Sequence, residues 1–236
     1  MAVKVKKQST FIDMTAMSDV TVLLLTFFML TSTFVKKEPI TVTTPASVSE
    51  IKVPETNSMT VLVDKDGKVF LSMDDPKHLV KTAVAVGADY GVTFTDAQLE
   101  TLSKTVSFGV PINKLPTYLD LRVDQQDKFM EEQLKIPGNN NVGIPADSVA
   151  SVKMLSYGGK QINEFQNWIR QARAIDNIRR ADAKDELEKK VKLQLVIKAD
   201  QTTRYEVVKG IMEDLRNLKE NQYLLVTSLR AAASEK

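Results

Sequence analysis

One acidic residue stands inside the long apolar segment near the N-terminus. Residues 14–35 are rich in Leu, Phe, Val, Met and Thr, and Asp19 is the only charged residue among them. A carboxylate in hydrocarbon costs about 2.5–3.5 kcal/mol on insertion scales, and intramembrane acids commonly serve proton relays or ion pathways. Burial disfavours the charged form of a carboxyl, so protonation changes the surroundings that Asp19 prefers. We therefore expect Asp19 to carry a proton.

Three threonines are placed to support this carboxyl. Thr15 lies one turn before Asp19, and Thr26 and Thr33 follow at spacings of seven residues, so all four share one helical stripe. Their hydroxyls could hydrogen-bond the carboxyl or hold a water on a proton pathway. Alternatively, Thr26 and Thr33 bond to carbonyls of their own helix or pack against a partner helix.

The apolar segment is long enough to cross a membrane. As a helix, residues 14–35 would extend about 33 Å, and the bilayer core is about 30 Å thick. Lysines flank both ends, so the positive-inside rule only weakly favours a cytoplasmic N-terminus (residues 1–13). The long remainder of the chain translocates largely regardless of charge, which predicts a single-pass inner-membrane protein with a periplasmic C-terminal domain. A cleavable signal peptide and a buried core helix are the alternatives.

Composition excludes several classes of function. The chain has 236 residues, 26% of them charged, and a net charge of only +2 without a concentrated basic face, which argues against nucleic-acid binding. With no Cys and a single His, His78, we expect no metal site and no cofactor. We find no nucleophile or phosphate-binding motif and predict no enzyme. We expect His78 to be a surface or half-buried side chain, Asp74-Asp75 to start a helix and Gly158-Gly159 to form a turn.

The remaining pattern predicts an α+β domain over residues 58–229. A proline-containing, extended linker (36–57) precedes it, and a polar tail (230–236) follows. Turn residues and hydrophobic periodicity predict the following elements: a hairpin of strands 59–64 and 68–73, helices 75–87, 96–105, 116–135 and 161–189, a loop at 136–145, a strand at 192–198, a turn at 199–203, a helix at 205–218 and a strand at 222–229 parallel to 192–198. The last strand, helix and strand form a βαβ unit, and residues 76–186 form a large helical insertion.

Three blocks of the sequence resemble the ExbD/TolR family of proton-driven inner-membrane motor subunits. The first is the apolar block 12–30, in which Asp19 falls on the family's essential aspartate. The second is the alternating segment 40–45, and the third is the closing unit, represented by 195–200 and 205–215. This chain departs from the family pattern at Ala16, where a proline is usual, and at Thr44, where a leucine is usual. Its insertion is also longer than the family's usual connection.

The resemblance implies a function and a set of partners. It implies a dimer held in a pentameric ring of ExbB-like polytopic membrane proteins, with proton flow past Asp19 doing work on a TonB-like energy transducer or on peptidoglycan. It also implies that the linker residues Ile40, Val42 and Pro45 bind a partner. The insertion is either an added helical layer or a docking surface. A non-conducting membrane anchor that binds peptidoglycan or a partner protein is the alternative function.

Overall fold

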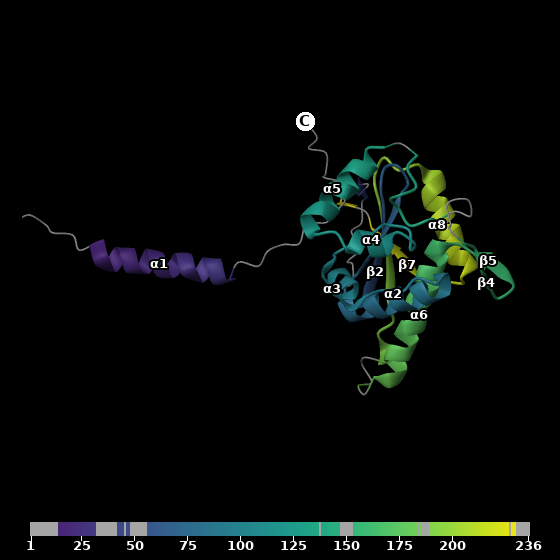
Figure 1. The fold of residues 1–236 in the computed structure, drawn as a ribbon, viewed down its shortest axis with the longest axis horizontal. Helices are drawn as coiled ribbons and strands as arrows, with labels where there is room; N and C mark the ends of the chain where they lie inside the picture. Colours follow the sequence, from purple (N-terminus) through teal and green to yellow (C-terminus); the bar gives the residue numbers. More distant parts are fainter. Residues whose placement is uncertain are drawn as a thin grey trace, which may run out of the picture. The chain divides into compact units, whose positions relative to one another are not determined.

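The chain folds as two compact units, residues 1–37 and 38–236, in the computed structural model. The structure describes residues 14–31, 42–44, 46–47, 56–136, 138–146, 153–183, 185, 189–226 and 228–229. The first unit contains the apolar helix α1, and the second contains the strands and all other helices that the structure describes (Figure 1).

The helix α1 runs from Met14 to Thr31 and is apolar on every face. None of its residues is buried, and its composition and length suit a membrane span. A helix that is hydrophobic all round, with no buried face, is typical of a membrane segment and not of a helix on a soluble core. The predicted end of this helix, residues 32–35, lies outside the described residues.

A four-stranded sheet organises the second unit. Its strand order is β3-β2-β6-β7, with bounds Ser58–Val63 (β2), Val69–Met73 (β3), Gln194–Ala199 (β6) and Tyr223–Leu225 (β7). The strands β2 and β3 form the predicted antiparallel hairpin, in which Val61 pairs with Leu71. The strand β6 runs parallel to β2, and β7 runs parallel to β6 after the helix α8 (Tyr205–Asn217). The fold is therefore α+β and contains the predicted βαβ unit.

The predicted strand at 222–229 is wrong as a single element. The strand β7 ends at Leu225, after which Val226 N–H donates to the Ile197 carbonyl. The chain then changes partner, and β8 (Ser228–Leu229) pairs in parallel with β1 (Ala46–Ser47) from the linker. A long-range pairing therefore divides the strand.

The predicted helix at 116–135 is also two elements. The helices α4 (Leu115–Leu119) and α5 (Val123–Leu134) are separated at Arg122, whose backbone is extended. The Gln98 side chain, in α3 (Asp96–Lys104), donates to the Asp120 carboxylate at 2.8 Å and ties this break to the neighbouring helix.

The long helix of the insertion is shorter than predicted. The helix α6 runs from Glu164 to Asp182, against a predicted range of 161–189, and Ile178 of its predicted apolar stripe is exposed. A hairpin of β4 (Leu155–Tyr157) and β5 (Lys160–Ile162) precedes it, and its turn is the predicted Gly158-Gly159 pair. The insertion therefore contains strands as well as helices.

The helix α2 (Pro76–Tyr90) begins as predicted. The Asp75 carboxylate accepts the Lys77 N–H at 2.9 Å and caps the helix N-terminus. The prediction that His78 is a surface or half-buried side chain is wrong. It is 3% exposed, and its Nε2 lies 3.0 Å from the Ala172 carbonyl oxygen of α6, so this ring joins two helices that lie side by side (Figure 1).

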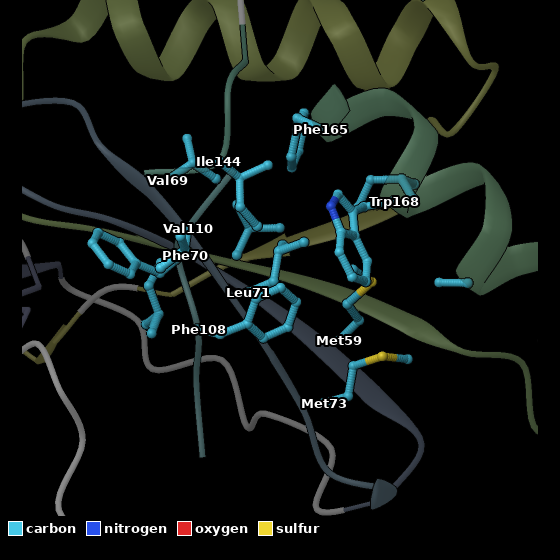
Figure 2. Close-up of a cluster of buried hydrophobic side chains, with 14 of the residues drawn as sticks. Met59, Val69, Phe70, Leu71, Met73, Phe108, Val110, Ile144, Phe165 and Trp168 are labelled. Atoms are coloured by element: carbon cyan, nitrogen blue, oxygen red, sulfur yellow. The ribbon is translucent and has the colours of Figure 1, made fainter. Parts of the chain in front are cut away.

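The core lies between the sheet and α6. Trp168 and Phe165 of α6 point toward Met59 and Leu71 of the hairpin (Figure 2). Phe108 packs on Trp168 with ring centroids 5.0 Å apart. Phe108 also exchanges two backbone hydrogen bonds with Leu71, at 2.8 and 2.9 Å, so the segment around it covers the outer edge of β3. Covering an edge strand in this way removes a site for unwanted strand pairing.

Replacing Gly109 by Ala should destabilise the fold. An added Cβ would lie 2.0 Å from Cδ1 of Phe70, which is fully buried. Overpacking of this kind costs about 1–3 kcal/mol. Urea unfolding of the full chain in detergent, followed by the fluorescence of its single tryptophan, measures the loss.

Gly210→Ala is the matched control for this substitution. Its Cβ would meet nothing within 4 Å, on a helix, so it should raise the unfolding free energy by about 0.5–1 kcal/mol. Equal stability of the two variants would contradict the packing described around Phe70.

Candidate functional site

The carboxyl of Asp19 lies in the second turn of α1 and is exposed. Thr15 and Thr26 share its stripe because the helix is continuous between them. Thr26 Oγ1 donates to the Leu23 carbonyl at 2.9 Å. This is the alternative in which the hydroxyl bonds to a carbonyl of its own helix. Thr33 lies outside the described residues.

Asp19 differs from the other polar residues of α1 whose bonds the structure gives. The hydroxyls of Ser18, Thr21 and Thr31 also donate to carbonyls of their own helix, at 2.7–2.9 Å. In the described part of the chain, Asp19 has neither a hydrogen bond nor an ion pair. A membrane span with such a carboxyl requires partner groups from elsewhere. The role of Asp19 itself stays a prediction.

The linker meets the folded domain at Thr43. Its N–H donates to Asp200 Oδ2 at 3.0 Å, and the Gln201 N–H donates to the Thr43 carbonyl at 2.8 Å. The other oxygen of Asp200 accepts from the Thr202 hydroxyl at 2.6 Å and from the Thr202 N–H at 2.9 Å. These bonds, that of the Thr202 hydroxyl first, hold the pKa of Asp200 below its ordinary value. The ionised carboxylate thus joins the linker to the turn between β6 and α8.

The predicted partner-binding residues of the linker fall around this contact. Val42 is half-buried and packs against the core, whereas Ile40 and Pro45 lie outside the described residues. With β1 paired to β8, the linker contacts its own domain at two places. Its predicted binding of a partner is not tested by these contacts.

A buried acid that the sequence did not reveal stands at the first turn of α6. Glu164 is fully buried, and its Oε1 accepts the Ile112 N–H at 2.8 Å. Burial raises the pKa of Glu164 from 4.5 to about 7, although the Ile112 N–H and the Trp168 indole oppose the shift. A Glu in the first turn of a helix is ordinarily a solvated residue that complements the helix dipole. No sequence signal distinguished this one.

The described residues contain no candidate metal-binding site. Among them, no group of three His, Asp or Glu side chains is placed to hold a metal ion.

Comparison with known proteins gives one family that matches nearly the whole chain. A protein-family model described as "Biopolymer transport protein ExbD/TolR" matches residues 6–229. The match spans the apolar helix, the linker and the α+β domain. No curated protein and no solved structure matches the chain.

Asp200→Ala should release the linker from the domain. A hydrogen bond to a charged group contributes about 1.5–3 kcal/mol, so amide exchange at Thr43 should accelerate about tenfold or more. Hydrogen–deuterium exchange of the full chain in detergent measures it. The control, Asp66→Ala, removes an exposed carboxylate in the hairpin turn and should leave Thr43 unchanged. An unaltered rate in Asp200→Ala would show that this contact does not hold the linker.

Glu164→Gln should stabilise the protein at alkaline pH. Because the folded pKa lies above the unfolded one, the folded state binds more protons between about pH 4.5 and 7, and the stability of the natural protein falls as pH rises through this window. Gln does not titrate and can still accept the Ile112 N–H. The variant should match the natural protein below about pH 4 and exceed it by about 1–3 kcal/mol at pH 8.

Urea titrations at several pH values give this difference. The control is Glu132→Gln, which alters an exposed carboxylate and should give a pH-independent difference. A pH-independent difference for Glu164→Gln as well would refute the raised pKa.

Proposed function

Because this chain belongs to the ExbD/TolR family of inner-membrane-anchored subunits of biopolymer-transport motors, we propose that it couples proton flow to mechanical work in such a motor. The family is one of non-enzymatic transport proteins, which agrees with the lack of catalytic motifs in this sequence. Beyond the family assignment, we propose that Asp19 carries the proton, that the N-terminus is cytoplasmic and the domain periplasmic, and that the work is done on a TonB-like transducer.

The proposal depends on one observation, the isolated carboxyl of Asp19 in an apolar helix. It is the one charged group of α1, no residue of that helix is buried, and the carboxyl has no partner among the described residues. A dimer of this chain inside a ring of ExbB-like subunits supplies the surroundings that such a carboxyl requires. The family has membrane-protein partners of the ExbB/TolQ type in general, which supports this arrangement.

Protonation and deprotonation of Asp19 switch the helix between two preferred environments. The neutral acid is stable in a dry contact between helices, whereas the ionised form is stable next to water or a cation. One elementary charge that moves through 100 mV releases about 2.3 kcal/mol. Such a free energy exceeds the thermal energy several-fold and is sufficient to bias a rotation or tilt of helices. Thr15 and Thr26 stand on the same stripe and line the proton's route, and Thr33, outside the described residues, is the third threonine assigned to it.

The folded domain delivers this work on the periplasmic side. The N-terminus is cytoplasmic in this arrangement, and the segment after α1 leads to the α+β domain. The domain acts on a TonB-like energy transducer, and the family's association with partners of the TonB/TolA type supports this direction. The linker, through Ile40, Val42 and Pro45, contributes to partner binding.

A non-conducting anchor is the competing function. It retains α1 and the domain, and Asp19 then only pairs or packs with a neighbouring helix. The two functions differ in whether the charge of Asp19 must change during work.

Asp19→Asn distinguishes the two functions. Asn keeps the size and polarity of Asp but cannot release a proton, so proton flux should fall to the level of empty liposomes. The measurement uses liposomes that contain this chain together with the polytopic subunit that co-purifies with it, an imposed pH gradient and a pH-sensitive dye. Asp19→Glu, the control, keeps the carboxyl and should retain a measurable part of the flux. Full flux in Asp19→Asn, at equal assembly with the polytopic subunit, would favour the anchor.

A further inference from the structure

A groove of about 1080 Å³ lies at the end of the sheet where β6 and β7 begin. The C-terminal half of α6 forms one side of it. The approach to β6 and the segment between α8 and β7 form the rest. None of the candidate site residues of the sequence analysis or of the proposed function lines this groove.

The groove concentrates positive charge on a chain that is almost neutral overall. The net charge of the whole protein is +2, yet this one surface carries five cationic side chains and a single carboxylate, Glu220. The cationic residues are Arg173, Arg180, Lys190, Lys192 and Lys219. The three lysines are exposed, and none has an ion pair in the described part of the chain. Their charges are therefore available to a ligand.

The two arginines are held in place by buried or half-buried acids. Arg173 pairs with Glu220 at 2.9 Å and also donates to the Leu193 carbonyl. Arg180 lies 3.3 Å from the carboxylate of Asp176, which is fully buried. The groove is thus a fixed surface, because its arginines are bonded to the residues that form its walls.

Asp176 joins the two walls directly. Its Oδ2 accepts the Leu193 N–H at 3.0 Å at the start of β6, and its Oδ1 accepts from Arg179 at 2.8 Å. Burial by itself would raise the pKa of Asp176, but these bonds outweigh it and lower the pKa. The ionised carboxylate holds α6 against the strand and gives the groove its shape.

The other lining residues indicate the kind of anion. Apolar residues lie among the cations: Val191 is exposed, Tyr223 and Leu224 are half-buried, and Leu193 and Leu195 are buried. Four side-chain amides lie there too: Asn177, Gln194, Asn221 and Gln222. An amide both donates and accepts, and so matches a peptide group. A lipid headgroup or a phosphate would use the cations and the amide N–H groups but offers little to the amide oxygens and the apolar side chains.

We propose that this groove binds an extended, acidic segment of a partner protein. Glutamates or aspartates of the segment pair with Lys190, Lys192 and Lys219. Its peptide groups contact the side-chain amides, and its apolar side chains contact Val191, Tyr223 and Leu224. Because one wall is α6, the insertion serves as a docking surface. The binding does not depend on proton carriage by Asp19, so either proposal can fail alone.

Removal of the three lysine charges tests the proposal. The probe is a short fluorescent peptide that alternates Glu with Val and Ser, titrated into the full chain in a non-ionic detergent at low salt. Three exposed charge pairs together contribute about a tenfold change in affinity, so the triple variant K190Q/K192Q/K219Q should bind about tenfold more weakly. The affinity of the natural protein should fall as salt is added.

Two controls make the result specific. The variant K77Q/K81Q/K128Q removes three exposed lysines outside the groove and should keep the affinity of the natural protein. The variant K190R/K192R/K219R keeps the charges and should also bind. A peptide with Gln in place of Glu should show no saturable binding.

Three results would overturn the proposal. The first is no saturable binding of the acidic peptide to the natural protein. The second is an equal loss of affinity in both Gln variants, which would mean a general charge effect. The third is lysine-dependent binding of phosphatidylglycerol vesicles without binding of the peptide, which would make the groove a contact for lipid.

Discussion

A carboxylate in a membrane-spanning helix needs partner groups, and the function proposed above depends on this constraint. The hydroxyls of Ser18, Thr21, Thr26 and Thr31 are bonded to carbonyls of α1, so they need no other partner. Asp19 has no such partner among the described residues, and its charge is costly in hydrocarbon. The helix therefore calls for other subunits. This requirement agrees with a family of motor subunits, and it is why the function proposed above depends on this one residue.

Two acids of the domain are fully buried, and their surroundings shift their pKa values in opposite directions. Both lie on α6. Glu164, in its first turn, accepts the Ile112 N–H, and burial raises its pKa to about 7, so it is partly protonated at neutral pH. Asp176, three turns later, accepts from Leu193 and Arg179, lies 3.3 Å from Arg180, and has a lowered pKa that keeps it ionised. The first state lowers the cost of burying α6 against the segment around Ile112. The second holds the end of the same helix to the start of β6, where a hydrophobic contact could not fix position as closely.

The sequence predicted those features whose signals are local. Alternating apolar residues around Lys65-Asp66-Gly67 predicted the β2–β3 hairpin, and a charge in an apolar run singled out Asp19. Features that need distant residues were missed. The break between α4 and α5 involves Gln98 from another helix, and β7 ends where β8 pairs with the linker. Burial of Glu164 and the basic groove arise only when segments far apart in the chain meet. Membership of the ExbD/TolR family was recognisable because its membrane block and closing unit are continuous in sequence.

The linker contact limits how work can reach the domain. The described part of the linker meets the domain at Thr43, bonded to the turn between β6 and α8, and at β1, paired with β8. Each is a small set of hydrogen bonds, whereas β2 and β6 are joined along six residue pairs within a buried core. Local openings of lowest free energy occur where few buried contacts oppose them. Tension along the linker would therefore separate Thr43 from Asp200 before it disturbed the sheet.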